Sequence, residues 1–129
     1  MNDLDDAARA HGPEADYRAA IADGEFVLQR CERCEARIFY PRLLCPSCGS
    51  RGLQATASSL RGVVYATTTV RQRPDAGGDY NVALIDLDEG PRMMSRVVGI
   101  PPHEVRIGDR VRGRVVEQDG DRLVVFETL

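Results

Sequence analysis

All four cysteines of this 129-residue chain lie within one segment, residues 31–48, as two Cys-x2-Cys pairs. Ten residues, "EARIFYPRLL", separate the pair Cys31/Cys34 from the pair Cys45/Cys48. A Cys-x2-Cys turn lets two thiolates converge on one point, and a hairpin can bring two such turns together. Four sulfurs in a tetrahedron are what Zn²⁺ accepts in structural sites. The four cysteines are therefore predicted to be the ligands of a structural zinc ion.

Other uses of four cysteines fit the pattern less well. Two disulfides need an oxidising compartment, and a thioredoxin-type redox pair stands alone at a helix N-terminus. Iron–sulfur clusters use four cysteines at different spacings, although iron in place of zinc, or a fold that has lost its metal, stays open. A catalytic zinc ion is disfavoured because four thiolates leave no open coordination position.

The remaining reactive residue types form no recognisable catalytic set. His11 and His103 are predicted to be solvated loop residues, far apart in the sequence. The acidic run at the end of a predicted strand is interpreted as a polar turn before Gly90-Pro91; its members are Asp86, Asp88 and Glu89. No arrangement of nucleophile, base and oxyanion donors is visible. Taken alone, the chain is predicted to be a binding or scaffolding module.

The elements that must position the cysteines are short. Residues 3–23 are predicted to be helical, with a second helix that starts at Pro13 and stops at Gly24. The segment "FVLQR" (26–30) is predicted to be a strand that leads into Cys31. Five strand-like runs divided by turn signals then follow, at 62–73, 80–88, 92–99, 109–118 and 122–129.

Five antiparallel strands of this spacing close most simply into a small Greek-key barrel of the oligonucleotide/oligosaccharide-binding (OB) type, with a flat sandwich as the alternative. The expected fold class is mainly β with a short helical N-terminus, a rubredoxin-like zinc ribbon and a five-stranded OB-fold barrel. The expected parts are the N-terminal helices (1–25), the zinc ribbon (26–52) and the barrel (60–129). One face of residues 109–118 should be apolar and the other basic, because arginines alternate there with small apolar residues.

Composition limits the partners. The net charge is −3 and all 17 basic residues are arginines, so the chain is not predicted to be a general polyanion binder. The barrel runs carry only Tyr65, Tyr80 and Phe126 as aromatics, which disfavours single-stranded nucleic-acid binding but leaves it as the alternative function. The N-terminus lacks an apolar stretch and no apolar run could span a membrane, so a cytoplasmic location without membrane association is expected.

The order of these segments resembles one protein family. A short helical N-terminus, the ribbon "LQRCERCEARIFYPRLLCPSCGS" and a barrel opening with "GVVYATTTV" are similar to a zinc-ribbon/OB-fold family formerly catalogued as a domain of unknown function, whose members accompany thiolases. The segments "YNVALIDLDEGPRMMSRVVG" and "VRIGDRVRGRV" look like its later strands. The resemblance covers nearly the whole chain, and the four cysteines map one for one onto the zinc ligands of the family.

The resemblance implies a non-catalytic accessory subunit in a hetero-oligomer with a thiolase-like enzyme. Such complexes form or cleave C–C bonds in acyl-CoA substrates, including retro-aldol cleavage of steroid side chains. The subunit would share coenzyme A or acyl-CoA with its partner, and the candidate phosphate contacts are Arg71, Arg73 and Arg96. A free-standing acyl-CoA carrier is a third hypothesis. Many members of the family carry an aromatic pair in the N-terminal helix, where this chain has only Tyr17.

Overall fold

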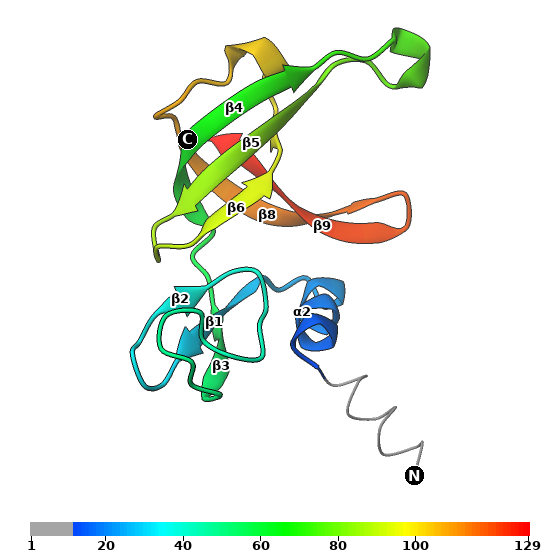
Figure 1. Ribbon diagram of the computed structural model, residues 1–129. Coiled ribbons are helices and arrows are strands. Elements are labelled where there is room, and N and C mark those ends of the chain that lie inside the picture. Colours follow the sequence, from blue (N-terminus) through cyan, green and yellow to red (C-terminus); the bar gives the residue numbers. More distant parts are fainter. Residues whose placement is uncertain (1–11) are drawn as a thin grey trace. The chain divides into compact units, whose positions relative to one another are not determined.

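The computed structural model describes residues 12–129 (Figure 1). The first part of the helical segment predicted from residue 3, and His11, lie outside the described residues. The chain divides into two compact units between Ser58 and Ser59. The domain boundaries predicted from the sequence stay predictions. Among the helices described, none is long and apolar enough to cross a bilayer.

In the first unit, helix α2 (Pro13–Ala22) has the boundaries that its proline and glycine predicted. Pro13 lies in the first turn, where its missing N–H removes no helical hydrogen bond. Gly24, just after the helix, adopts a φ of 84°, which suits a glycine. The ring of Tyr17 packs edge-on against Phe26 and Phe39, with centroid distances of 6.0 and 5.8 Å. These aromatic contacts attach the helix to the cysteine-bearing part of the same unit.

The first unit also contains a three-stranded antiparallel sheet in the order β2-β1-β3. Its strands are β1 (Val27–Cys31), β2 (Arg37–Ile38) and β3 (Leu53–Ala57). The central strand β1 buries Leu28 and ends at the first cysteine, which confirms the predicted strand into Cys31. The first Cys-x2-Cys pair therefore lies at the turn between β1 and β2.

The second unit is a six-stranded sheet in the order β6-β5-β4-β8-β9-β7; Figure 1 labels all of these strands except β7. The strands are β4 (Arg61–Val70), β5 (Tyr80–Leu87), β6 (Arg92–Ser95), β7 (Val97–Val98), β8 (Arg110–Gln118) and β9 (Asp121–Thr128). Short 3-10 turns lie at η1 (Pro74–Ala76) and η2 (Pro102–Glu104). A register shift between Val64 and Ala66 bends β4, which pairs with β8 at its start and with β5 along its length. Each of the five predicted runs contains a strand, and β8 and β9 form an antiparallel hairpin.

The run predicted as one strand at 92–99 is divided into β6 and β7, and this closes the barrel. β6 pairs antiparallel with β5, whereas β7 pairs with β9 in a parallel register, Val97 opposite Phe126. The expectation of a wholly antiparallel sheet was therefore wrong at this one pairing. The physical reason is that the segment 92–98 forms hydrogen bonds with two different strands, first with β5 and then with β9. The mainly β fold with a short helix, a ribbon and an OB-type barrel is confirmed.

The core of the second unit is built from the inward positions of these strands. Phe126, Ile85 and Val111 are fully buried. A Cβ on Gly113 would lie 2.9 Å from the Phe126 ring, so only glycine lets that ring pack against β8. The other face of β8 is basic and exposed, as predicted; its arginines are Arg110, Arg112 and Arg114. Two of the three are engaged by carboxylates of neighbouring strands or turns.

Candidate metal centre

The first cysteine turn is a closed loop of backbone hydrogen bonds. The amide of Cys31 donates to the carbonyl of Ala36 at 2.9 Å, and the amide of Glu35 donates to the carbonyl of Cys31 at 2.8 Å. Glu35, the residue after the second cysteine of the pair, has a φ of 64°. A non-glycine residue in this conformation carries a cost of about 1 kcal/mol, which the surrounding turn must offset.

The second cysteine turn repeats the first residue by residue. The amide of Cys45 donates to the carbonyl of Ser50, and the amide of Gly49 donates to the carbonyl of Cys45, both at 2.8 Å. Gly49 has a φ of 77°, a left-handed conformation that glycine adopts without steric cost. Two turns with the same hydrogen-bond pattern therefore present their thiols in the same way.

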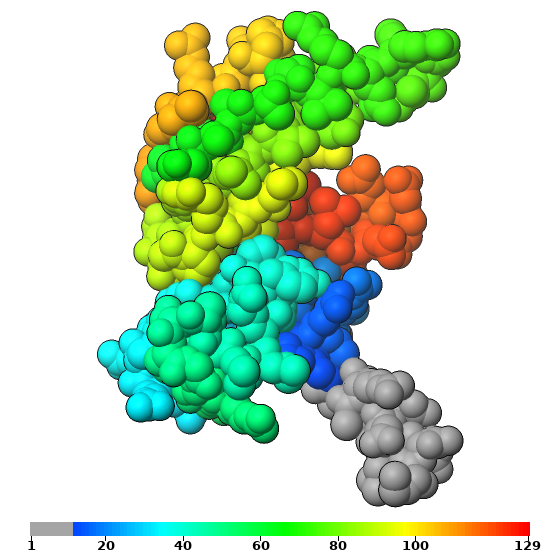
Figure 2. Space-filling view, in the orientation of Figure 1, coloured from blue at the N-terminus to red at the C-terminus, as the bar shows by residue number. Residues whose placement is uncertain are grey.

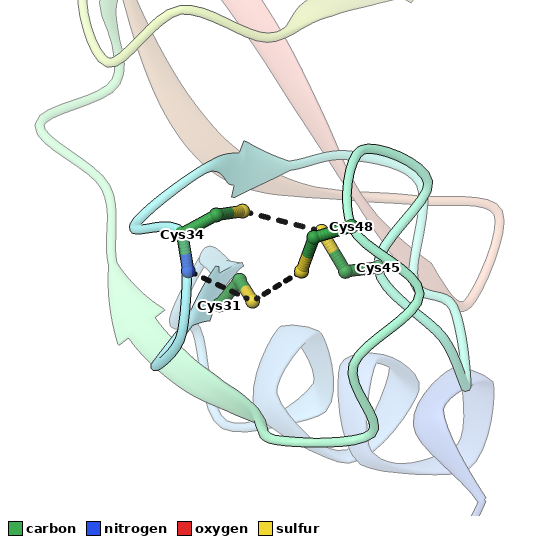
Figure 3. Close-up of side chains that lie close together, drawn as sticks. All are labelled: Cys31, Cys34, Cys45 and Cys48. Atoms are coloured by element: carbon green, nitrogen blue, oxygen red, sulfur yellow. Dashed lines mark hydrogen bonds between the residues drawn. The ribbon is translucent and has the colours of Figure 1, made fainter.

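The two turns bring their four sulfurs together (Figure 3). All four Sγ atoms lie within 4.8 Å of one another. Cys31 Sγ lies 3.6 Å from Cys48 Sγ, and Cys34 Sγ lies 3.6 Å from Cys45 Sγ (Figure 3). Zinc–sulfur bonds of about 2.3 Å in a tetrahedron separate the sulfurs by about 3.8 Å. The donor set and its spacing thus fit a zinc ion held by four thiolates, with no coordination position left for a substrate.

The residues around the four sulfurs favour a structural metal ion, one that stabilises the fold of the first unit. Cys31 and Cys45 are buried together with Ile38, and Ala36 and Leu53 pack against them. The amide of Cys34 donates to Cys31 Sγ and lowers the pKa of that thiol to about 6. For Cys34 the amide of Ala36 acts in the same direction, but partial loss of hydration and the three neighbouring sulfurs raise the pKa of its thiol to about 12. A cation would hold all of these thiols as thiolates and would form the centre of a small core.

Among residues 12–129, the four cysteines are the only group of three or more potential metal ligands that lie together. His103 lies exposed in η2. Asp86 is part of β5 and pairs with Arg92 at 2.6 Å, and Asp88 pairs with Arg110 at 3.1 Å. These carboxylates therefore stabilise contacts between neighbouring strands and turns.

Two of the three candidate phosphate contacts lie in the loop between β4 and β5. Arg71 pairs with Asp79 at 3.2 Å, and Arg73 pairs with Asp75 through two contacts, the shorter at 2.8 Å. All of these side chains except that of Asp79 are more than half exposed. Each guanidinium already has an acidic neighbour, which reduces its attraction for a further anion.

The third candidate, Arg96, lies between β6 and β7 and has different surroundings. Its guanidinium lies over the ring of Tyr80, 4.7 Å from the centroid. Tyr80 pairs with Val70, the last residue before Arg71, so the three candidate arginines belong to the same end of the second unit. No carboxylate in residues 12–129 pairs with Arg96.

A hollow in the first unit was not predicted from the sequence. It has a volume of about 330 Å³ and lies between α2 and the ribbon, where its lining includes Tyr17, Phe39, Leu43, Arg42 and Arg51. The available signal was the run "YPRLL", which places large apolar residues between two metal-binding turns. That run of residues could not show that α2 forms the other wall of the hollow.

Comparison with known proteins identifies both parts of the chain. A family model described as the ChsH2 rubredoxin-like zinc ribbon domain matches residues 18–54. A second model, the ChsH2 C-terminal OB-fold domain, matches residues 55–116. Together the two matches cover well over half of the chain.

Curated relatives and solved structures agree with the family models. A DUF35 domain-containing scaffold protein of Pyrococcus furiosus is 31% identical over 102 residues, which are 73% of this chain and 75% of that protein. A probable enoyl-CoA hydratase alpha subunit of Thermomonospora curvata is 34% identical over 91 residues, 69% of this chain but only 28% of that longer protein. The solved Ltp2-ChsH2(DUF35) aldolase contains a chain that matches with a TM-score of 0.79 and 30% identity, covering 90% of this chain and 94% of that one. A DUF35 protein of unknown function from Sulfolobus solfataricus shares the fold at a TM-score of 0.63 and 13% identity.

Proposed function

The chain belongs to the DUF35 family of zinc-ribbon/OB-fold proteins, and from this premise we propose that it is a non-catalytic accessory subunit of an enzyme that acts on acyl-CoA. The observation that carries the proposal is the match over 90% of this chain to a chain of the Ltp2-ChsH2(DUF35) aldolase. The names of two kinds of relatives, scaffold proteins and a probable enoyl-CoA hydratase subunit, support the same class of role.

The partner that fits the proposal is a thiolase-fold enzyme, in a hetero-oligomer with this chain. The partner would supply the catalytic residues, and the reaction would form or cleave a C–C bond of an acyl-CoA. Retro-aldol cleavage of a steroid side chain is one reaction of this class. Support comes from the aldolase match and from the family resemblance of the ribbon and barrel segments.

This chain would contribute rigidity and charge. A zinc ion at Cys31, Cys34, Cys45 and Cys48 supplies a cross-link of four thiolates and no acid–base chemistry. The ribbon turns and the sheet β2-β1-β3 then form a fixed body that can dock on the partner. The barrel would close one wall of the coenzyme A channel.

Of the three candidate phosphate contacts, Arg96 is the strongest. Its guanidinium is held over Tyr80 and has no acidic partner in the described chain, so it can bind a phosphate without first breaking an ion pair. Arg71 and Arg73 would have to exchange Asp79 and Asp75 for the phosphate. Exposed contacts of this kind are weak in isolation, so the lone subunit should bind coenzyme A poorly and the complex should bind it well.

The test is purification of the tagged chain from its host, with mass spectrometry of the proteins and ligands that accompany it. A stoichiometric acyl-CoA enzyme of the thiolase class is the expected result. Isolation of the chain alone would contradict the proposal. Co-purification with nucleic acid, lost as the salt concentration rises, would favour the alternative OB-fold function instead.

A further inference from the structure

A groove runs along the first unit between the start of α2 and the loop that joins the two cysteine pairs. It combines the hollow of about 330 Å³ with a second, more open one of about 470 Å³. Four residues line both hollows and define the groove: Pro13, Pro41, Arg42 and Leu43. The groove therefore lies entirely within one compact unit of the chain.

The walls of the groove are held in place before anything binds. The side-chain amide of Gln29 donates to the carbonyl of Arg42 at 2.9 Å and accepts from the Arg42 amide at 2.7 Å. The hydroxyl of Tyr40 donates to Glu14 on α2 at 3.1 Å, and its ring lies 5.5 Å from that of Tyr17. Binding sites on proteins are usually preformed in this way, because a rigid site loses little entropy when it is occupied.

The loop exposes apolar side chains beside the groove. Tyr40, Leu43 and Leu44 have exposed fractions of 43%, 73% and 48%, and they stand within five consecutive residues. The segment near residue 40, cyan in Figure 2, lies on the molecular surface. Contiguous exposed apolar side chains mark interaction sites more often than isolated ones do.

The two arginines of the groove lack ion-pair partners in the described part of the chain. Arg42 and Arg51 line the smaller hollow, and within residues 12–129 neither guanidinium forms an ion pair. Asp16 is the one acidic side chain in that lining. Glu14 lines the other hollow but already accepts hydrogen bonds from Arg18 and Tyr40. An occupant that brings a carboxylate would thus meet two free guanidinium groups.

We propose that this groove is the docking site for a segment of the partner enzyme that carries a large apolar side chain next to a carboxylate. The apolar side chain enters between Pro13, Pro41 and Leu43. The carboxylate then reaches Arg42 or Arg51 at the edge of the smaller hollow. This proposal rests on the accessory function proposed above. It adds the surface of this chain that binds the enzyme and the kind of side chains that the enzyme presents there.

The test begins with the purified complex of the tagged chain and its identified acyl-CoA enzyme. A photo-crosslinking p-benzoylphenylalanine replaces Leu43, and mass spectrometry locates the cross-linked peptide. The expected product is one peptide of the enzyme that has a large apolar residue adjacent to Asp or Glu. A cross-link to residues 1–11 of this chain, to a second copy of the chain, or to an enzyme peptide without a carboxylate would overturn the proposal.

Binding measurements give an independent readout. Leu43→Asp and Arg51→Glu should each weaken the affinity for the enzyme by about 30-fold, the range of an interface hot spot. The matched controls are Ile107→Asp, since Ile107 is 71% exposed in the second unit, and Arg122→Glu on the exposed end of the β8–β9 hairpin. Unchanged zinc content shows that each variant keeps its ribbon. Groove variants that bind as tightly as the controls would overturn the docking site alone, whereas a wild-type chain that binds no acyl-CoA enzyme would overturn the accessory function as well.

Discussion

The side-chain oxygen of Asn81 accepts a hydrogen bond from the backbone amide of Val97 at 3.0 Å, in the interior of the second unit. Asn81 is 1% exposed, and its Nδ2 group donates to Thr67 Oγ1 at 2.8 Å and to the carbonyl of Thr68 at 3.2 Å. One side chain thus joins β4, β5 and the start of β7. It satisfies the Val97 amide at the point where the chain changes its partner from β5 to β9.

Replacement of this asparagine tests its role in the barrel. Asn81→Leu should lower the free energy of unfolding of the second unit by about 3 kcal/mol, because it leaves the buried amide of Val97 and the Thr68 carbonyl short of a partner. Urea unfolding measures the loss, and hydrogen exchange at Val97 should become faster. Gln118→Leu at the exposed end of β8 is the control and should change stability little. Equal stability of the two variants would show that Asn81 does not close the barrel.

Metal removal tests the ribbon. The purified chain should contain one zinc ion, and a strong chelator should remove the amide protection of β1 and β3 while that of β5 and β8 persists. The reason is that three of the metal-binding cysteines make up half of the six residues in the small core of the first unit, whereas the second unit has its own core. Hydrogen exchange with and without chelator measures both parts. Zinc affinity should also fall as the pH falls, since protons compete for the thiolates. Loss of protection throughout the chain, or none in the ribbon, would contradict this account.

A single methyl group should disrupt the β4–β5 pairing. A Cβ on Gly62 would clash with the backbone oxygen of Asp86, and that backbone cannot move without breaking the hydrogen bonds between β4 and β5. Gly62→Ala should therefore destabilise the second unit by about 3 kcal/mol. Gly120→Ala is the matched control, because Gly120 has a φ of 84° in open space and should cost only about 1 kcal/mol. Thermal unfolding of both variants measures which one loses more stability. A larger loss for Gly120→Ala than for Gly62→Ala would contradict the steric role of Gly62.

The candidate phosphate contact can be tested in the complex. Arg96→Ala should raise the KM for acyl-CoA about tenfold with little change in kcat, because it removes a charge-assisted contact to the non-reacting part of the substrate. Arg71→Ala should have a smaller effect, since Arg71 is already paired with Asp79. Arg112→Ala on the exposed face of β8 serves as the control. A KM that Arg96→Ala leaves unchanged would remove Arg96 from the coenzyme A site.

Much of this fold follows from local sequence signals. Pro13 and Gly24 mark the ends of α2, and the spacing of the cysteines marks both ribbon turns, because each of these features depends on a few neighbouring residues. The alternation of arginine and small apolar residues in β8 likewise gives its two faces.

The parts that the sequence did not reveal depend on distant residues. The break between β6 and β7 is set by the hydrogen bond between Asn81 and Val97, which are 16 positions apart, and by the pairing of β7 with β9. A buried asparagine within the apolar run "YNVALIDL" was the available signal. The groove was missed because its two walls come from α2 and the ribbon loop, which meet only in the folded unit.

The central claim is that this chain assists an acyl-CoA enzyme without performing chemistry itself. The most direct test is acyl-CoA turnover measured for the purified chain alone, for its co-purified enzyme alone, and for the reconstituted complex. The account predicts no turnover by the lone chain and a clear gain in turnover when the chain is added to the enzyme. Turnover by the lone chain, or an enzyme whose rate is the same with and without it, would contradict the claim.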